Sequence, residues 1–75
     1  MRESYIDKKL TSETIREAIQ QSGMPQAQIA RKMGISPVMV SRWTKGKHVP
    51  DTDYLVHLSD ILSVSVDKLI IRKKL

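Results

Sequence analysis

The sequence predicts a small all-α domain, and three observations support this fold class. Apolar residues recur at helical spacing along most of the 75 residues. Ser, Asp, Pro and Gly stand where helices would begin and end. A chain this short holds a single hydrophobic core. Because Phe is absent and Trp occurs once, that core has to be built mainly from Ile, Leu, Val, Met and Ala.

The first helix is expected over about residues 12–22, with Thr11 or Ser12 as its N-cap and Gly23 as its end. The second is expected to start at Pro25 and to stop at Gly34, where a left-handed residue allows a tight turn. Each has an apolar face, formed by Ile15, Ala18 and Ile19 in the first and by Ile29, Ala30 and Met33 in the second.

The third helix is expected over about residues 37–45, because Ser36 followed by Pro37 is a preferred pair at a helix start. Asp51 caps a fourth helix and Ser65 a short fifth one. The residues expected to face inward on these three helices are Val40, Trp43, Leu55, Leu58, Ile61, Leu62, Leu69 and Ile70. The alternation in residues 63–66 is too short for a strand, so no strand of useful length is expected.

These boundaries divide the chain into an N-terminal arm at 1–11, a helical domain at 12–71 and a basic C-terminal tail at 72–75. The net charge of +5 is spread unevenly over them. Residues 18–50 contain no acid, and their cations are Arg31, Lys32, Arg42, Lys45 and Lys47. The charged residues of 51–67 are all acids, and those of 68–75 are all cations. Concentrated positive charge is typical of proteins that bind polyanions.

Composition excludes several other classes. The chain has no Cys, so disulfides and thiolate metal sites are excluded and a reducing cytoplasm is expected. No Cys and no cluster of acidic residues lies at a spacing that would complete a metal site with His48 and His57, so neither a metal nor another cofactor is expected. The chain is too short to enclose a deep substrate cleft, so we expect no enzyme. No apolar run approaches the length of a membrane span, and no membrane partner is expected.

The segment from Gln26 to Thr44 contains two short helices joined by a turn with Gly34. Such helices pack nearly perpendicular only if the residue at their crossing is small, and Ala30 meets that demand. The outer surface of the second of these helices then carries Pro37, Val38, Ser41, Arg42 and Lys45. This surface is slender and cationic.

Over about residues 12–71 the chain resembles the lambda-repressor-like helix-turn-helix domains, also called XRE-type or Cro-type. The resemblance rests on the segments at 26–30, 34–36, 40–43, Gly46-Lys47, Pro50 and 62–69. It implies a compact five-helix fold with the helix-turn-helix motif at helices two and three. Four positions depart from the family pattern. Pro25 replaces a capping Thr or Ser, Ile19 and Thr44 replace an internal ion pair by what we expect to be apolar packing, and Ser63 stands where Gly is common.

The resemblance implies that the third helix enters the major groove of double-stranded DNA. Pro37, Val38 and Arg42 would lie nearest the base edges, with Ser36 and Ser41 beside them. Gln26, and less directly Gln28, would contact phosphate at the start of the second helix. Lys45 and Lys47 would lie along the other side of the groove.

The sequence thus predicts a sequence-specific transcriptional regulator of the phage Cro or repressor kind. It would bind a pseudo-palindromic operator as a homodimer, formed in solution or only on DNA. Ile70 and Ile71 are candidate dimer contacts. The alternative is a small antitoxin or protein-interaction module with autoregulatory DNA binding. An exposed apolar surface on the Tyr5 to Leu10 arm or around Ile70 and Ile71 would favour that alternative.

Overall fold

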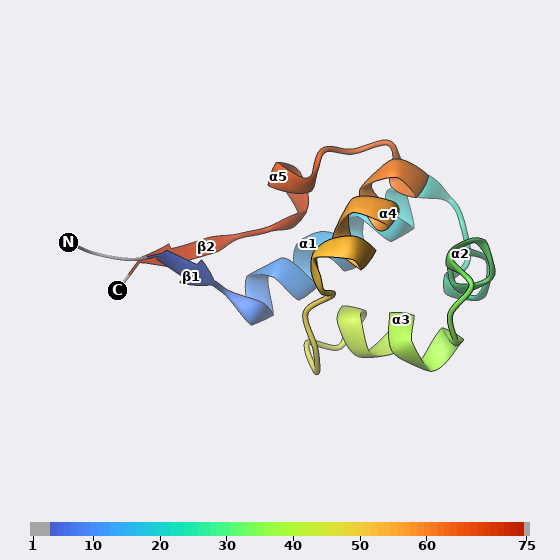
Figure 1. Ribbon diagram of the computed structural model, residues 1–75, viewed down its shortest axis with the longest axis horizontal. Coiled ribbons are helices and arrows are strands. Elements are labelled where there is room, and N and C mark those ends of the chain that lie inside the picture. Colours follow the sequence, from blue (N-terminus) through green and yellow to red (C-terminus); the bar gives the residue numbers. More distant parts are fainter. Residues whose placement is uncertain (1–3, 75) are drawn as a thin grey trace.

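The computed structural model describes residues 4–74, which form five helices and a small two-stranded sheet (Figure 1). The helices are α1 (Lys8–Ser22), α2 (Gln26–Met33), α3 (Pro37–Thr44), α4 (Thr52–Leu62) and α5 (Val66–Leu69). The strands are β1 (Ser4–Ile6) and β2 (Arg72–Lys74), which lie together at one end of the molecule (Figure 1). The prediction of an all-α domain with five helices is confirmed, with the sheet as an addition at its end. Within residues 4–74 no helix is long and apolar enough to cross a membrane.

The five helices enclose one apolar core. Its buried members are Ile15, Ile19, Ile29, Ala30, Met33, Val40, Trp43, Leu55, Leu58, Leu62 and Leu69, all of which were expected to face inward. The Trp43 ring packs against Tyr54, with centroids 5.7 Å apart and planes tilted by 46°. Aromatic pairs favour such a tilted arrangement. The core therefore uses one face of every helix, and the opposite faces are left for solvent or partners.

Local capping groups fix the starts of α3 and α4 as the sequence predicts. The Ser36 hydroxyl accepts a hydrogen bond from the Met39 N–H at 3.3 Å, and the Asp51 carboxylate accepts one from the Tyr54 N–H at 3.1 Å. Pro25 at the start of α2 provides no side-chain cap. At the end of α4, Ser63 adopts a left-handed conformation with φ of 56°, which Gly would adopt more easily, in line with the Gly that the resemblance implies at this position.

The expected start of the first helix is wrong. α1 begins at Lys8, and its N-cap is Asp7, whose carboxylate accepts a hydrogen bond from the Leu10 N–H at 2.9 Å. Thr11 and Ser12, the expected caps, are buried inside this helix. Their hydroxyl groups bond to distant parts of the chain. The Thr11 hydroxyl accepts a hydrogen bond from the Ile71 N–H at 3.0 Å, and the Ser12 hydroxyl donates one to the Trp43 carbonyl of α3.

The sequence predicts no strand of useful length, but the structure contains two short strands. β1 pairs antiparallel with β2, so that Tyr5 lies opposite Lys73. The ladder continues to Asp7, whose N–H donates to the Ile71 carbonyl at 2.8 Å. Each strand has only three residues, and the two come from opposite ends of the chain. The N-terminal arm and the basic tail therefore meet in one structure.

Candidate nucleic-acid interface

The joint between α2 and α3 has the geometry that the sequence predicts for a helix-turn-helix. Gly34 ends α2 in a left-handed conformation with φ of 71°. One residue later the Ile35 N–H donates to the Ala30 carbonyl at 3.0 Å, which closes the turn. Ala30 itself is 1% exposed. A larger side chain at this position would have to displace the core.

A groove along the outer face of α3 brings together five of the nine predicted site residues. Val38, Ser41, Arg42 and Lys45 recur at helical spacing and line one groove of about 600 Å³ together with Lys47 and His48. Val38 is 60% exposed, so its apolar side chain is accessible from the groove. The groove thus combines an apolar side chain, a hydroxyl group and three cations, the groups that contact thymine methyl groups, base edges and phosphates.

Ser36 and Pro37 are exposed at the first turn of α3, beside this groove in sequence. The Ser36 hydroxyl also serves as the N-cap of the helix. A contact from Ser36 to DNA would therefore have to be compatible with its capping hydrogen bond. The Pro37 ring makes no hydrogen bond and is not restricted in this way.

The C-terminal end of α3 is held by side chains from α1. The Ser12 hydroxyl donates to the Trp43 carbonyl at 2.7 Å, and the Arg16 guanidinium donates to the Thr44 carbonyl at 3.2 Å. The last carbonyls of a helix have no partner within the helix, and a cation beside them is also favoured by the helix dipole. α1 therefore fixes the end of the helix whose outer face lines the groove.

Gln26 at the start of α2 is half-buried and contacts the same end of α3. Its side-chain amide donates to the Thr44 hydroxyl at 3.3 Å, and that hydroxyl donates to the Ser41 carbonyl at 3.0 Å. The expected apolar replacement of the family's ion pair is correct for Ile19, which lies in the core, and wrong for Thr44, which is 4% exposed and hydrogen-bonded. A buried hydroxyl requires such partners. Gln28, the second predicted residue of α2, is half-buried two residues further along the helix.

Sequence reasoning missed the cations of α1. Lys8, Lys9 and Arg16 line a groove of about 480 Å³ together with Lys45. Glu13 lies in the same groove. The charges of residues 1–17 sum to zero, which concealed them. Their helical spacing, with Lys9 and Arg16 two turns apart, was the available signal.

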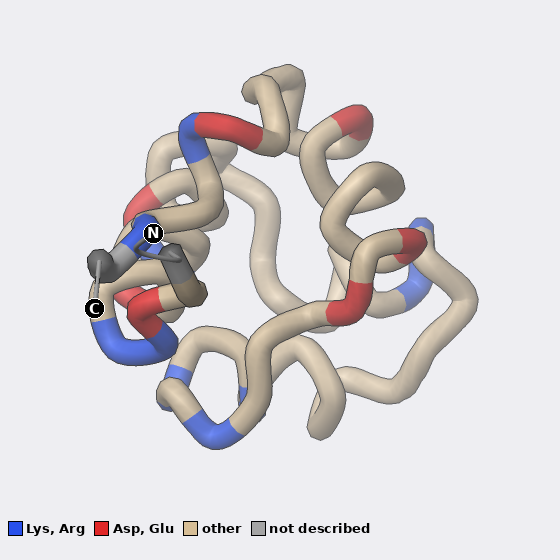
Figure 2. The backbone as a smooth tube through the Cα atoms, turned by 60° about the vertical axis from the view of Figure 1, so that its left-hand side comes forward, with Lys and Arg blue, Asp and Glu red and all other residues tan. Residues whose placement is uncertain are grey.

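The acidic residues of the second half of the chain are Asp51, directly before α4, and those on α4 and α5, whereas the charged residues of α2, α3 and residues 45–50 are all cations (Figure 2). The face built by α3 is therefore the one suited to a polyanion. Among residues 4–74 no group of three or more His, Cys, Asp or Glu side chains is placed to hold a metal ion.

Comparisons with known proteins agree with this geometry. The family model described as helix-turn-helix matches residues 15–69. No curated protein matches the chain. The solution structure of the SOS-response transcriptional repressor LexA from Eubacterium rectale is similar, with a TM-score of 0.80 and 30% sequence identity over 85% of this chain and 68% of that one. The chain belongs to the lambda-repressor-like, XRE-type helix-turn-helix family, whose members are DNA-binding regulators.

Proposed function

We propose that this protein is a sequence-specific transcriptional regulator of the phage Cro or repressor kind. It acts in the cytoplasm, where it reads the major groove of operator DNA with α3. The observation that carries the proposal is the groove on α3, in which Val38, Ser41 and Arg42 lie beside Lys45 and Lys47. A groove with these groups offers both base contacts and phosphate contacts on one helix face.

The roles divide by chemistry. Arg42 presents two parallel N–H groups to O6 and N7 of a guanine, and Ser41 hydrogen-bonds a neighbouring base edge. Val38 and Pro37 make apolar contacts with a thymine methyl group, and Ser36 lies next to them. Lys45 and Lys47 neutralise phosphates on one side of the groove. Gln26 and Gln28 contact phosphate at the start of α2.

One recognition helix reads only a few base pairs, so we propose that two copies bind a pseudo-palindromic operator. The two recognition helices then lie about 34 Å apart on one face of the duplex. Footprints should show two inverted half-sites about one helical turn apart. A single short asymmetric footprint at every protein concentration contradicts this arrangement.

Replacing Arg42 or Lys47 with Ala tests the two kinds of contact. Arg42→Ala should cost about 1–3 kcal/mol on the preferred site and relax the choice at one base pair. Lys47→Ala should weaken binding to all sequences alike and lower the slope of log affinity against log salt by about one unit per protomer.

The measurement is a titration of both variants against a duplex selected from a random pool and against its scrambled sequence, at several salt concentrations. If Arg42→Ala weakens the two duplexes equally, Arg42 does not read a base, and specificity comes from Val38, Ser41 or DNA shape. If the wild-type protein selects no sequence at all, the proposed function is wrong.

A second candidate function is a protein-interaction module such as an antitoxin that regulates its own synthesis. The observation that favours it is the exposed apolar surface at the N-terminal end, where Tyr5 and Leu10 are each 44% exposed. Monomers and dimers of this chain alone would then bind DNA weakly, and a toxin protein bound to that surface would be needed for tight operator binding. Tight, selective binding by the isolated chain favours the first candidate.

A further inference from the structure

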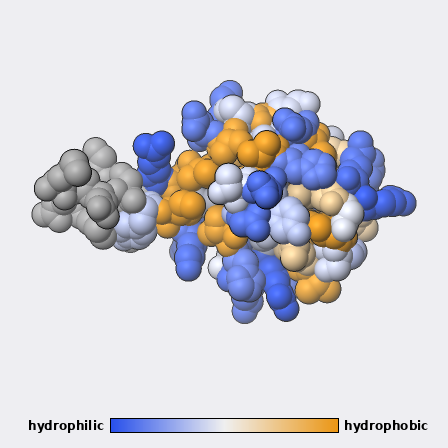
Figure 3. All heavy atoms as spheres, viewed as in Figure 1, coloured by the Kyte–Doolittle hydropathy of each residue, from blue (hydrophilic) through white to orange (hydrophobic). Residues whose placement is uncertain are grey.

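Apolar side chains are exposed together at the end of the molecule formed by β1 and the start of α1. Tyr5 and Leu10 are 44% exposed and Ile6 is 36% exposed. Figure 3 shows apolar surface reaching from the body of the protein toward this end. Contiguous exposed apolar surface marks interaction sites more often than chance placement does.

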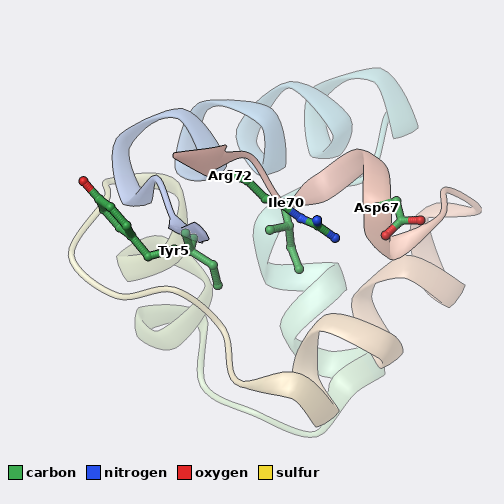
Figure 4. A pocket seen from close by; sticks show the side chains of 5 residues that line it. Tyr5, Asp67, Ile70 and Arg72 are labelled. Atoms are coloured by element: carbon green, nitrogen blue, oxygen red, sulfur yellow. The ribbon is translucent and has the colours of Figure 1, made fainter. Parts of the chain in front are cut away.

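A depression of about 530 Å³ lies at the same place, lined by Tyr5, Ile6, Asp67, Ile70 and Arg72. In Figure 4 the Tyr5 ring points away from Ile70 and Asp67, toward the outside of the molecule. Tyr5 therefore does not fill the depression. Its ring is available to a partner that approaches β1.

The two outer edges of the sheet differ in charge. All three residues of β2 are cationic, whereas Ser4, Tyr5 and Ile6 of β1 are uncharged. Lys and Arg on an edge strand hinder pairing with a further strand, and a second copy of β2 would also repel the first. Within residues 4–74 the sheet contains only these two strands, so the outer edge of β1 carries no described strand. β1 is the edge that can accept one.

Hydrogen-bond alternation identifies the backbone groups on that edge. The Asp7 N–H donates to Ile71 of the opposite chain end, so Asp7 and, two residues earlier, Tyr5 direct their backbone groups toward β2. Ser4 and Ile6 then direct their N–H and C=O groups toward the free edge. A two-stranded sheet is only marginally stable in water, and further strands stabilise it.

We propose that β1 of a second copy of this chain pairs antiparallel with this edge, so that two protomers share one four-stranded sheet. The inference names the interface of the two-fold assembly in the proposed function and rests on it. In the one symmetric register that uses all four outward groups, Ser4 lies opposite Ile6 and each Tyr5 lies opposite the other Tyr5 on the two-fold axis. The two tyrosines form a non-hydrogen-bonded pair, in which side chains are closest.

This arrangement has the same two-fold symmetry as the proposed operator. Antiparallel pairing places the two helical bodies at opposite ends of the shared sheet, and each protomer is 42 Å long with the sheet at one end. The two α3 helices are thereby held apart. The backbone N–H and C=O of Ile71 bond within the protomer, to Thr11 and Asp7, and the expected contact of the Ile70 and Ile71 side chains in a dimer stays a prediction.

Single cysteines test the register, because the chain has none of its own. Opposed residues in a non-hydrogen-bonded pair have Cα atoms about 4.5 Å apart, within the range of a disulfide. Tyr5→Cys should therefore give severalfold more covalent dimer under mild oxidation than Ile6→Cys. In the proposed register the two Ile6 positions are offset by two residues, about 7 Å along the strands, which a disulfide does not bridge well.

Charge tests the interface in sedimentation experiments. Tyr5→Lys places two like charges opposite each other on the axis and should abolish the dimer. Val56→Lys is the matched control, because Val56 is similarly exposed at 49%, lies on α4 outside the sheet and gains the same charge. It should leave the dimer unchanged.

Both experiments are performed with free protein and with a duplex selected by the wild-type chain, since pairing on DNA alone also supports the proposal. Equal cross-linking of the Tyr5 and Ile6 variants in both conditions, or equal effects of the two Lys variants, overturns it. A chain that stays monomeric in both conditions also overturns it and leaves the apolar end to a different protein. If the Tyr5 variant cross-links but no DNA sequence is selected, the pairing stands and the proposed function fails.

Discussion

Removal of the Ser12 hydroxyl should destabilise the protein through the end of α3. Ser12 is 6% exposed, and its hydroxyl lies 2.7 Å from the Trp43 carbonyl oxygen. A buried acceptor that loses its partner costs about 1–3 kcal/mol. The same carbonyl also receives the Gly46 N–H at 3.4 Å, a long bond that offsets part of this loss. We therefore expect Ser12→Ala to lower the free energy of unfolding by about 1–2 kcal/mol.

The measurement is thermal unfolding followed by circular dichroism. For a domain of this size each kcal/mol shifts Tm by about 4–8 °C, so Ser12→Ala should lower Tm by roughly 5–15 °C. Thr14→Ala is the control. Thr14 is half-buried on the same helix, and its hydroxyl donates to the Leu10 carbonyl within α1 at 2.9 Å. Water can replace that bond, and Ala is the better helix former, so this variant should change Tm little.

The two variants also distinguish an effect on the position of α3 from an effect on the stability of the whole protein. At a temperature where both are fully folded, Ser12→Ala should weaken binding to the selected duplex, because Lys45 and Lys47 directly follow the loosened end of α3. If Ser12→Ala and Thr14→Ala melt and bind alike, the contact from α1 does not hold α3 in place, and the reasoning is refuted.

Two further stability changes follow from the helix joints. Ala30→Leu should lower the free energy of unfolding by about 1–3 kcal/mol, because Ala30 of α2 is 1% exposed and lies in the core. An unchanged melting curve contradicts a close crossing of α2 and α3 at this residue. Ser63→Gly should raise it by about 0.5 kcal/mol, because relief of the left-handed strain at φ of 56° exceeds the added entropy of the unfolded chain. Ser65→Gly, at φ of −74°, has no strain to relieve and should lower it, so similar shifts in both variants would contradict this explanation.

The starts of α3 and α4 and the turn between α2 and α3 could be predicted because their causes are local. Ser36 and Asp51 each accept a hydrogen bond from an N–H three residues later, and Gly34 supplies the positive φ of the turn. Each of these interactions lies within a few neighbouring residues. The pattern of residue types is then sufficient.

The start of α1 and the sheet depend on contacts between distant parts of the chain. Thr11 and Ser12 have the chemistry of N-caps, but their hydroxyls bond to Ile71 and Trp43, and Asp7 caps the helix instead. β1 and β2 are too short for an alternating pattern, and each is completed only by the other. No local rule distinguishes such an arm from an irregular end.

The same distinction applies to the candidate site. Val38, Ser41, Arg42 and Lys45 share a face by helical spacing alone, so their gathering in one groove follows from the sequence. Arg16 belongs to another helix and reaches Thr44 only because α1 packs beside the end of α3. Its position could not be predicted without the packing of the core.

The end of α3 therefore depends on polar contacts from two other helices. Gln26 of α2 and Arg16 of α1 both bond to Thr44, through its hydroxyl and its carbonyl respectively. A phosphate that draws the Gln26 amide away would leave Thr44 with its bond to the Ser41 carbonyl and its bond from Arg16. DNA binding at the start of α2 can then proceed without freeing α3, because α1 holds the helix from the other side. In the proposed function α1 contributes to DNA binding by holding α3 in position, whether or not Lys8 and Lys9 contact a phosphate.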